Sequence, residues 1–362
     1  MDGSPISSTT PDPTWSVRFD LRLDPSRNEE RPALYRAALE LASRADEKGC
    51  SSFILSEHHG ADDGYLPSGL TFAAAVGALT ARARLNISAL ILPLHDPIRA
   101  AEETLVVDQL SAGRVDVIVG LGYVRSEYAM HGLDPSERVA ILEAKLPVYL
   151  DALTGKPFSI DGRTVRVTPG PVQQPRPTVL LAASVPAAAR RAARLADGVH
   201  CLVPRSELEP HYVQERERLG LGRGLVAGGE GSSGSVFVSD DPERAWQELG
   251  PYILHEINGY GRWAVENAAN QHLYQPTDDL DVARAMGMHV ILTPDEAAAQ
   301  LVAAATSGLM LNPLVGGLPL HMAEPYFAAF VEQALPLARL RQAEYPTRAS
   351  AAAGDASGSQ RG

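Results

Sequence analysis

The chain has 362 residues, of which 45% are hydrophobic and 21% are charged, so it can bury a large core. Its formal net charge is −12 and no basic run interrupts that balance, which argues against nucleic acid and anionic membranes as partners. The two cysteines, Cys50 and Cys201, are far apart in the sequence and offer no disulfide framework, as expected of a cytoplasmic protein. No apolar stretch approaches the roughly 20 residues of a membrane span.

The two ends of the chain differ in composition from the part between them. Residues 1–14 are rich in Ser, Thr and Pro and lack the basic-then-apolar order of a signal peptide, and residues 347–362 are rich in Ala, Gly and Ser. We therefore expect a flexible N-terminal tail, a disordered C-terminal tail and one domain over 15–346.

Strand-like and helix-like segments alternate in the first half of the chain. Residues 17–21 alternate with period two, as in a strand, whereas 31–48 carry apolar residues at helical spacing and are followed by Gly49, a typical helix C-cap. The same criteria predict further strands at 52–55, 85–92 and 115–119, and further helices at 67–83, 97–110 and 135–153.

This alternation is interrupted and then resumes. Residues 158–167 indicate a hairpin with Asp161-Gly162 as a type I′ turn, and the four prolines of 169–177 exclude regular structure. A glycine-rich loop is expected at 221–234, and an irregular, aromatic-containing insertion at 252–288. Strands are predicted at 179–181, 199–203, 235–238 and 309–311, and helices at 186–196, 206–219, from 242 to at least 249, 294–307 and 324–340.

Eight strand–helix units in sequence predict an α/β fold, a closed (β/α)₈ TIM barrel with insertions near 155–178 and 250–288. The alternative is an open doubly wound sheet. No G-x-G-x-x-G sequence follows the first strand, which argues against that alternative. Gly120-Leu121-Gly122 is only a fragment of such a motif and indicates close backbone approach at a strand end.

A polar cluster, Ser56-Glu57-His58-His59-Gly60, directly follows the apolar run at 52–55. In a parallel α/β sheet, ligands bind at the carboxyl ends of the strands. Two adjacent histidines beside a carboxylate can supply a proton acceptor near neutral pH. The alternative is a polar strand end where one histidine caps a helix or faces water. His58, His59 and His95 have no Cys or Glu set at metal-ligand spacing, so no metal site is expected.

Five segments, taken together and in this order, resemble the bacterial luciferase-like monooxygenase superfamily over about 17–198, with a weaker match onward to Pro336. Each segment is unspecific alone, but the ordered set is specific. They are Glu57-His58-His59; Ala89 to Pro93 with His95, Pro97, Arg99 and Glu102; Asp108 to Arg114; Gly120 to Tyr123 with Glu127 and Gly132; and Ala183-Ser184 with Ala192, Ala193, Ala196, Asp197 and Gly198.

The resemblance implies a (β/α)₈ barrel, usually dimeric, that binds a reduced flavin at the carboxyl ends of its strands. Members of the superfamily use reduced FMN and oxygen, or the deazaflavin coenzyme F-420 for hydride transfer. Since the chain has no nicotinamide-binding signature, a separate flavin reductase would supply the reduced FMN. We expect a homodimer that takes O₂ and a small organic molecule as substrates.

The resemblance also assigns residues to the site. His58 matches the position of a catalytic histidine, with His59 and Glu57 beside it, and Glu57 either orients an imidazole or caps the next loop. The Ser88-Ala89 bond matches a non-prolyl cis peptide that lies under the flavin ring in the family. Further cofactor contacts are expected from Gly120, Gly122, Tyr123, Glu127, Ala183, Ser184 and Val185.

Alternatives stay open at two of these residues, at Leu121 and at the insertion. Ser184 suits a flavin phosphate at the start of a helix, or is a plain N-cap. Glu127, with Arg125, closes over the ligand or begins a solvated helix. Leu121 stands where bacterial luciferase has a phosphate-binding arginine, so a different cation must serve or another flavin binds. The insertion at 252–288 is a lid over the site or a dimer contact.

Together these features predict a cytoplasmic flavin-dependent oxidoreductase, a two-component monooxygenase using reduced FMN and O₂ on a small organic substrate. The first alternative is an F-420-dependent dehydrogenase or reductase. The second is a non-catalytic flavin-binding partner subunit. The Glu57-His58-His59 cluster argues against this second alternative, although a fold alone never implies activity.

Overall fold

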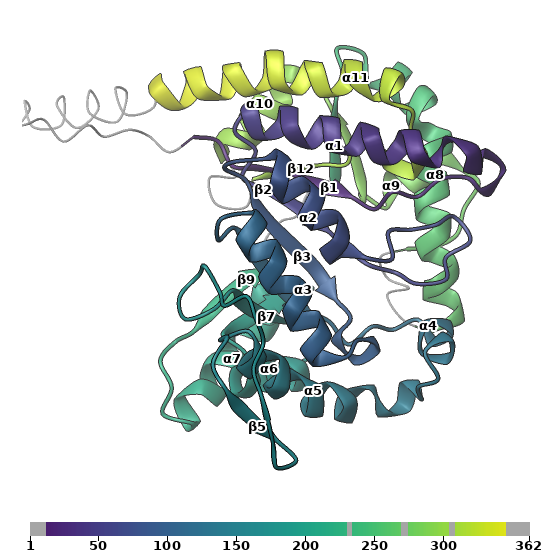
Figure 1. Ribbon diagram of the computed structural model, residues 1–362. Coiled ribbons are helices and arrows are strands. Elements are labelled where there is room, and N and C mark those ends of the chain that lie inside the picture. The colour runs from purple at the N-terminus through teal and green to yellow at the C-terminus, as the bar shows by residue number, and fades with distance from the viewer. Residues whose placement is uncertain (1–11, 230–233, 269–273, 304–307, 345–362) are drawn as a thin grey trace, which may run out of the picture.

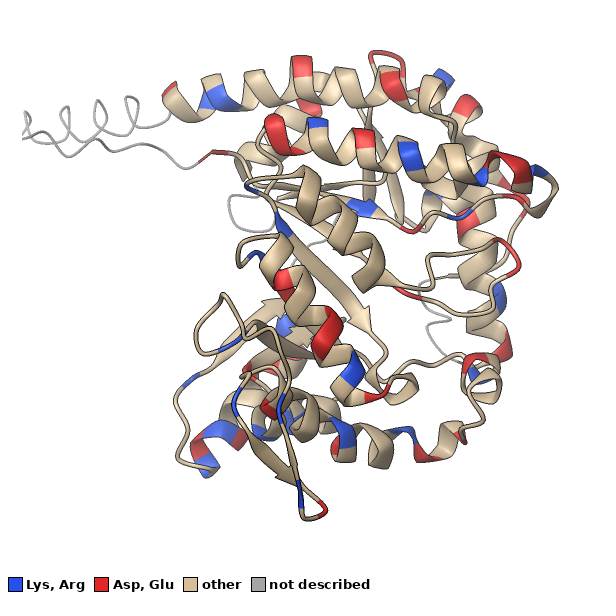
Figure 2. Ribbon diagram, in the orientation of Figure 1, with Lys and Arg blue, Asp and Glu red and all other residues tan. Residues whose placement is uncertain are grey.

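The structure is a computed structural model that describes residues 12–229, 234–268, 274–303 and 308–344 (Figure 1). The two expected tails fall almost entirely on 1–11 and 345–362, outside the described residues. None of the helices in the described ranges is both long and apolar enough to cross a membrane. Along the exposed face of α1 (Arg31–Glu47), acidic and basic residues are interspersed (Figure 2).

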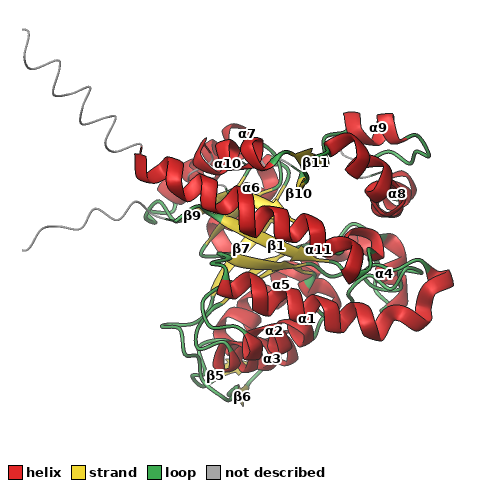
Figure 3. Cartoon of the chain, turned by 90° about the horizontal axis from the view of Figure 1, so that it is seen from above, coloured by secondary structure: helices red, strands yellow, loops and turns green. Residues whose placement is uncertain are grey.

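Ten parallel strands form one sheet at the centre of the molecule, and helices surround it (Figure 3). This confirms the predicted α/β fold. The strand order is β11-β10-β12-β1-β2-β3-β4-β7-β8-β9, so no ladder among the described residues joins the end strands β9 and β11. The strands are β1 (Trp15–Phe19), β2 (Ser52–Leu55), β3 (Arg84–Leu90), β4 (Val115–Val119), β7 (Thr178–Ala183), β8 (Gly198–Cys201), β9 (Leu225–Gly228), β10 (Ser235–Val238), β11 (His289–Leu292) and β12 (Leu309–Leu311).

The helices lie mostly within a few residues of their predicted positions, and the predicted hairpin is β5 (Phe158–Ile160) with β6 (Arg163–Val165). Its turn residues Asp161 and Gly162 have φ values of 49° and 76°, both positive as a type I′ turn requires. Besides α1, the helices are α2 (Gly69–Leu79), α3 (Pro97–Leu110), α4 (Arg125–Met130), α5 (Arg138–Ala152), α6 (Pro186–Leu195), α7 (Arg205–Arg218), α8 (Pro242–Glu266), α9 (Leu280–Ala285), α10 (Pro294–Ala303) and α11 (Leu320–Ala328).

The two faces of β1 differ in chemistry. Trp15 and Phe19 are each 1% exposed, and their rings pack on Phe330 at 5.0 Å and on Phe72 of α2 at 6.1 Å between centroids. This face of the strand is therefore the apolar one that packs on helices. Because side chains alternate along a strand, Arg18 lies on the opposite face, inside the sheet. The inner face of the sheet thus carries charge at the level where the strands end.

The predicted irregular insertion at 252–288 is wrong over its first half. Helix α8 runs without a break through Pro251 to Glu266, and Leu249, Ile253 and Ile257 are fully buried at helical spacing. Gly250-Pro251 resembles a helix stop, but burial of this apolar stripe outweighs the local cost of the proline.

The sequence also misses two short strands. The expected loop at 221–234 contains β9, which pairs with β8 through Gly198↔Leu225 and the next three residues. Beyond the insertion, β11 pairs with β10 in register from Ser235↔His289. Each strand is only four residues long, too short for period-two patterning to distinguish it from a loop.

Candidate functional site

His58 and Glu127 form a buried pair at the carboxyl ends of the strands. His58 follows β2, and its Nδ1 lies 2.7 Å from Oε1 of Glu127, which projects from the short helix α4 after β4. The two residues are 9% and 1% exposed. Since a carboxylate only accepts, Nδ1 carries the hydrogen and Nε2 is left as the acceptor of a neutral imidazole. The solvated-helix alternative for Glu127 is therefore wrong.

Aromatic rings surround the His58 imidazole. Its centroid lies 4.3 Å from Trp263, 4.8 Å from Tyr65, 5.8 Å from Tyr123 and 6.0 Å from Tyr260. Burial lowers the pKa of His58 below 6.5, although its hydrogen bond to Glu127 acts in the opposite direction. The neutral imidazole is thus the prevailing form at neutral pH, as a proton acceptor requires.

His59 points away from His58, as expected for adjacent residues at a strand end. Glu57 Oε1 accepts from the backbone N–H of Ile91 at 2.8 Å and contacts Nε2 of His95 at 2.9 Å and Nε2 of His59 at 3.5 Å. Burial raises the pKa of Glu57, but hydrogen bonds from the two imidazoles outweigh it and lower the pKa to about 2. Glu57 therefore both orients imidazoles and ties β2 to the segment after β3.

The ligand atoms of Glu57, His59 and His95 lie within 4.8 Å of one another, a spacing that could hold a metal ion. The sequence argument against a metal overlooked Glu57, which the fold brings between the two histidines. Hydrogen bonding already accounts for much of this arrangement, because Glu57 Oε1 accepts from both Ile91 and His95.

Small residues let the backbone pack closely where β3 and β4 end. The Ser88-Ala89 peptide bond is cis, as the resemblance implied. A Cβ at Gly120 would lie 2.9 Å from the Ala89 Cβ, and one at Gly122, where φ is +71°, would lie 2.7 Å from Cγ2 of Ile91. Only glycine fits at these two positions, which supports the predicted close backbone approach.

Ser184 and Val185 lie at the open end of β7, ahead of α6. Both are exposed, whereas Ala183 is buried. The N-cap of α6 is Val185 and no side chain caps the helix, so Ser184 is not the plain N-cap that was one of its alternatives. Val185 and the neighbouring Leu202 are 52% and 56% exposed, which leaves an apolar surface beside the helix N-terminus.

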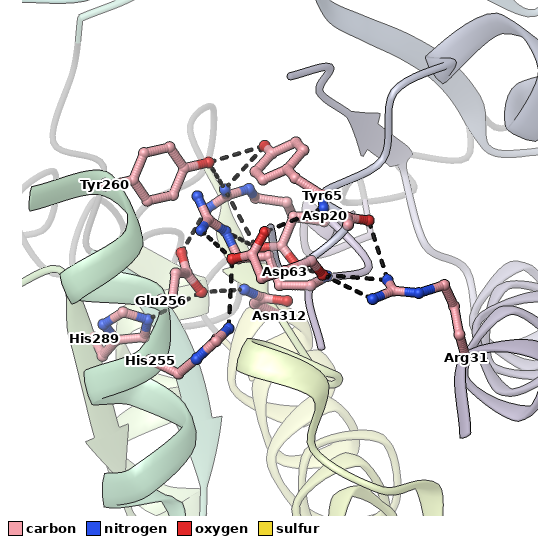
Figure 4. A network of polar contacts seen from close by, with 12 residues as sticks. Asp20, Arg31, Asp63, Tyr65, His255, Glu256, Tyr260, His289 and Asn312 are labelled. Atoms are coloured by element: carbon pink, nitrogen blue, oxygen red, sulfur yellow. Dashed lines mark hydrogen bonds and ion pairs between the residues drawn. The ribbon is translucent and has the colours of Figure 1, made fainter. Parts of the chain in front are cut away.

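The sequence analysis missed a charged network on the inner face of β1 (Figure 4). Arg18 Nη1 donates to Glu256 Oε1 at 3.0 Å, and Arg22 Nη1 donates to Asp63 Oδ2 at 2.6 Å. Glu256 Oε2 also accepts from Asn312 at 2.9 Å. Arg18, Asp20 and Arg22 alternate with apolar residues along 17–23, and this period-two pattern of charges is the signal that could have revealed the network.

The second half of α8, which was predicted as part of the insertion, lies at the site. Figure 4 shows His255, Glu256 and Tyr260 directed from this helix toward the network. Trp263, one turn further along, contacts His58, and the Asn267 side chain after the helix accepts from the Arg125 backbone N–H of α4 at 2.8 Å. The segment therefore lies over the carboxyl ends of the strands, the position that a lid requires.

A parallel α/β protein with a His–Glu pair and a glycine-lined surface at the strand ends has the features of an enzyme site. A sequence model of the luciferase-like monooxygenases matches residues 15–311. The chain therefore belongs to the luciferase-like monooxygenase family.

Among relatives, uncharacterised protein y4vJ of Sinorhizobium fredii is 28% identical over 221 residues, 60% of this chain and 61% of that one. The matched region thus spans less than two thirds of that relative. An F420-dependent glucose-6-phosphate dehydrogenase of Nakamurella multipartita is 26% identical over 323 residues, 83% of this chain and 91% of that one.

Two solved structures share the fold. Monooxygenase RslO1 from Streptomyces bottropensis superposes with a TM-score of 0.68 at 22% identity, covering 89% of this chain and 99% of that one. The oxygenating constituent of 3,6-diketocamphane monooxygenase from Pseudomonas putida, a type II Baeyer–Villiger enzyme in complex with FMN, gives 0.65 at 16% identity, covering 90% and 98%.

Proposed function

We propose that the protein is the oxygenating component of a two-component monooxygenase, which takes reduced FMN from a separate reductase and uses O₂ on a small organic substrate. The observation that carries the proposal is the buried His58–Glu127 pair, set in an aromatic cage beside the glycine-lined surface of β3 and β4. Family membership supplies the flavin chemistry, and the geometry supplies a proton acceptor next to it.

The residues present fit a bound flavin ring. Because Gly120 and Gly122 lack a Cβ, the backbone after β4 lies directly against Ala89 and Ile91, and a flavin ring would lie on this flat surface. The exposed backbone at Ser184 and Val185, at the start of α6, would hold the flavin phosphate. Leu121 offers no charge there, so backbone N–H groups and Ser184 carry this contact. When bound, reduced flavin would supply the electrons that activate oxygen.

The protein's own residues would move a proton and exclude water. Glu127 holds Nδ1 of His58, so that Nε2 faces the cage as acceptor and can take a proton from the substrate. Tyr65, Tyr260 and Trp263 surround that imidazole with apolar surface, which keeps water from the reacting atoms.

The experiment is a comparison of two reductants under the same conditions. Enzyme is mixed in turn with reduced FMN and with reduced F-420, with and without O₂, and product, oxygen uptake and coenzyme oxidation are recorded. The proposal expects oxygen-dependent turnover with FMN alone. Oxygen-independent oxidation or reduction with F-420 would contradict it.

The F-420 alternative has one specific observation in its favour. The dehydrogenase of Nakamurella multipartita, which matches over 83% of this chain, is named as F420-dependent. Leu121 also agrees with this alternative, because it stands where bacterial luciferase has a phosphate-binding arginine. If the protein binds oxidised F-420 but not oxidised FMN, the F-420-dependent dehydrogenase is favoured.

A further inference from the structure

Three side chains with metal-binding atoms meet just past the ends of β2 and β3, beside the His58–Glu127 pair. Glu57 and His59 follow β2, and His95 follows β3. Oε1 of Glu57 lies 2.9 Å from Nε2 of His95 and 3.5 Å from Nε2 of His59. The ligand atoms of all three residues lie within 4.8 Å of one another. One carboxylate and two imidazoles form a ligand set that zinc takes in proteins.

Hydrogen bonds explain only part of this cluster. Glu57 accepts from the backbone N–H of Ile91 and lies at hydrogen-bonding distance from His95. The 3.5 Å contact between Glu57 and His59 is longer than a normal N–H···O bond. His131, just after α4, brings a third imidazole, whose ring centroid lies 5.2 Å from that of His59. The fold thus gathers more imidazoles at this point than the hydrogen bonds of one carboxylate require.

The spacing of the side chains suits a small divalent ion. Two ligand atoms on a tetrahedral ion with bonds of about 2.0 Å lie about 3.3 Å apart. The two Glu57 contacts, at 2.9 and 3.5 Å, fall on either side of that value. The ring centroids of His59 and His95 are 6.0 Å apart, against about 5 Å for two imidazoles on one such ion. A small rotation of His95 therefore completes the set.

The cluster is open to solvent on the side of the histidines and closed on the side of the carboxylate. The side chains of His95 and His59 are 23% and 9% exposed, whereas that of Glu57 is 1% exposed. An ion can therefore enter past His95 and reach a carboxylate that water does not surround, where its attraction to the charge is strong.

We propose that Glu57, His59 and His95 bind one Zn²⁺ ion, whose fourth position faces His131. Imidazole ligands favour zinc, cobalt and nickel, whereas magnesium and calcium prefer oxygen ligands. The ion would join the segments that follow β2 and β3. It would leave the His58–Glu127 pair intact, since neither residue belongs to the ligand set. The site takes no part in the proposed flavin chemistry and does not depend on it.

Calorimetric titration of the full-length, untagged protein with Zn²⁺ tests the proposal. We expect one site per chain in the unmodified protein, and no competition from an excess of Mg²⁺. His95→Asn and His59→Asn should each weaken Zn²⁺ binding by at least the roughly 10–100-fold that metal sites lose with an outer-shell partner alone. His321→Asn is the matched control, because it removes an exposed histidine of α11 and should bind Zn²⁺ as the unmodified protein does.

Co²⁺ supplies a second readout that needs no variant. Bound to nitrogen and oxygen ligands at this site, it should give visible d–d absorption bands without the sulfur-to-metal charge-transfer bands of a cysteine site. Zn²⁺ should displace these bands. Circular dichroism checks that each variant is folded. If His59→Asn is not folded, the Co²⁺ spectrum and His95→Asn, whose side chain is the more exposed, still decide the question.

Three results would overturn the proposal. They are no Zn²⁺ binding by the unmodified protein, full affinity in the folded His95→Asn variant, and a Co²⁺ spectrum with sulfur bands. Neither flavin nor oxygen enters the titration, so its outcome is separate from that of the proposed function. Failure to bind Zn²⁺ would leave the monooxygenase proposal standing, and Zn²⁺ binding without any flavin reaction would contradict only the monooxygenase.

Discussion

Two arginines at opposite ends of the sheet differ in how fully their donors are used. Arg114, just before β4, donates from all three of its nitrogens to oxygens of Ser111, Ala83, Thr80 and Gly77, at 2.6 to 3.0 Å. Arg22, just after β1, uses one nitrogen of three in a hydrogen bond. Both stand next to a strand, but only the second is left with buried, unpartnered N–H groups.

The difference separates polar groups that hold the fold from those that are available to a ligand. At the amino ends of the strands, Arg114 donates hydrogen bonds to the segment that joins α2 to β3, and each of its three side-chain nitrogens already has an acceptor. At the carboxyl ends, buried atoms without a hydrogen-bond partner include Arg22 Nε and Nη2 and Glu127 Oε2. Since an unmade hydrogen bond in the interior is costly, such atoms together indicate a functional site.

The largest expected effect on stability is at the amino ends of the strands, where all the nitrogens of the Arg114 side chain have hydrogen-bond partners. Arg114→Met leaves several carbonyl oxygens without a donor, and we expect it to lower the free energy of unfolding by about 3–4 kcal/mol. Urea denaturation measures the change. Arg99→Met, which removes only exposed ion pairs on α3, serves as the control and should change stability little. A small loss at Arg114 would break the contrast between the two ends.

A substitution of His58 tests the carboxyl ends of the strands, where buried polar atoms lack hydrogen-bond partners. We expect His58→Ala to lose roughly 10²–10⁴-fold in turnover, since that is what a general acid–base group contributes, while flavin still binds. Stopped-flow turnover and a flavin titration on the same preparation measure the two quantities. Wild-type turnover in the folded variant would rule out a catalytic role and leave the His58–Glu127 pair as structure alone.

The two ends also differ in how well the sequence predicts them. The apolar run of β2 and the polar residues after it predict where Glu57, His58 and His59 lie, because burial and strand polarity are local properties. The Glu127 contact is not local, since 69 residues separate it from His58 in the chain. The sequence could list Glu127 as a site residue but could not show that it holds the imidazole.

The contacts of Arg22 and the helical structure of α8 were missed for a related reason, although the segment's place over the site was expected. The surroundings of Arg22 include residues 259–263, which pack on its guanidinium. These residues belong to α8, and the Gly250-Pro251 sequence had predicted an irregular insertion there instead of a helix. By contrast, the boundaries of α3, β4, β10 and β12 agree with the sequence prediction, because clear breakers or apolar runs mark them.

Glu127→Gln tests whether Glu127 is a positioning residue that acts through His58. Glutamine keeps an oxygen for Nδ1 but loses the negative charge that raises the pKa of His58. The pKa of His58 should therefore fall further, and the acid limb of kcat/KM should move to lower pH. We expect kcat to fall about 10–100-fold with little change in flavin affinity. An unchanged pH profile would contradict the assignment.

Trp263→Ala distinguishes a lid from an interface. Because Trp263 covers His58 from α8, its removal should admit water and raise hydrogen peroxide release several-fold per flavin oxidised. Flavin affinity should stay near normal. Trp246→Ala is a suitable comparison, since Trp246 lies on the same helix but about five turns earlier, away from the cage. If peroxide release is unchanged and Trp263→Ala becomes monomeric on a sizing column, α8 is a dimer contact instead.

The smallest expected effect on ligand binding is at Ser184, an exposed residue whose hydroxyl tests whether a hydrogen-bond donor without a protein partner contacts the ligand. Ser184 is exposed and does not cap α6, so its hydroxyl is free to contact a flavin phosphate. It would be one donor among several backbone N–H groups, so Ser184→Ala should weaken FMN binding by only about 0.5–1.5 kcal/mol. Riboflavin lacks the phosphate and should bind the variant as it binds the unmodified protein. Fluorescence titration with both flavins decides the question: equal weakening of FMN and riboflavin would show that the hydroxyl acts elsewhere than at the phosphate.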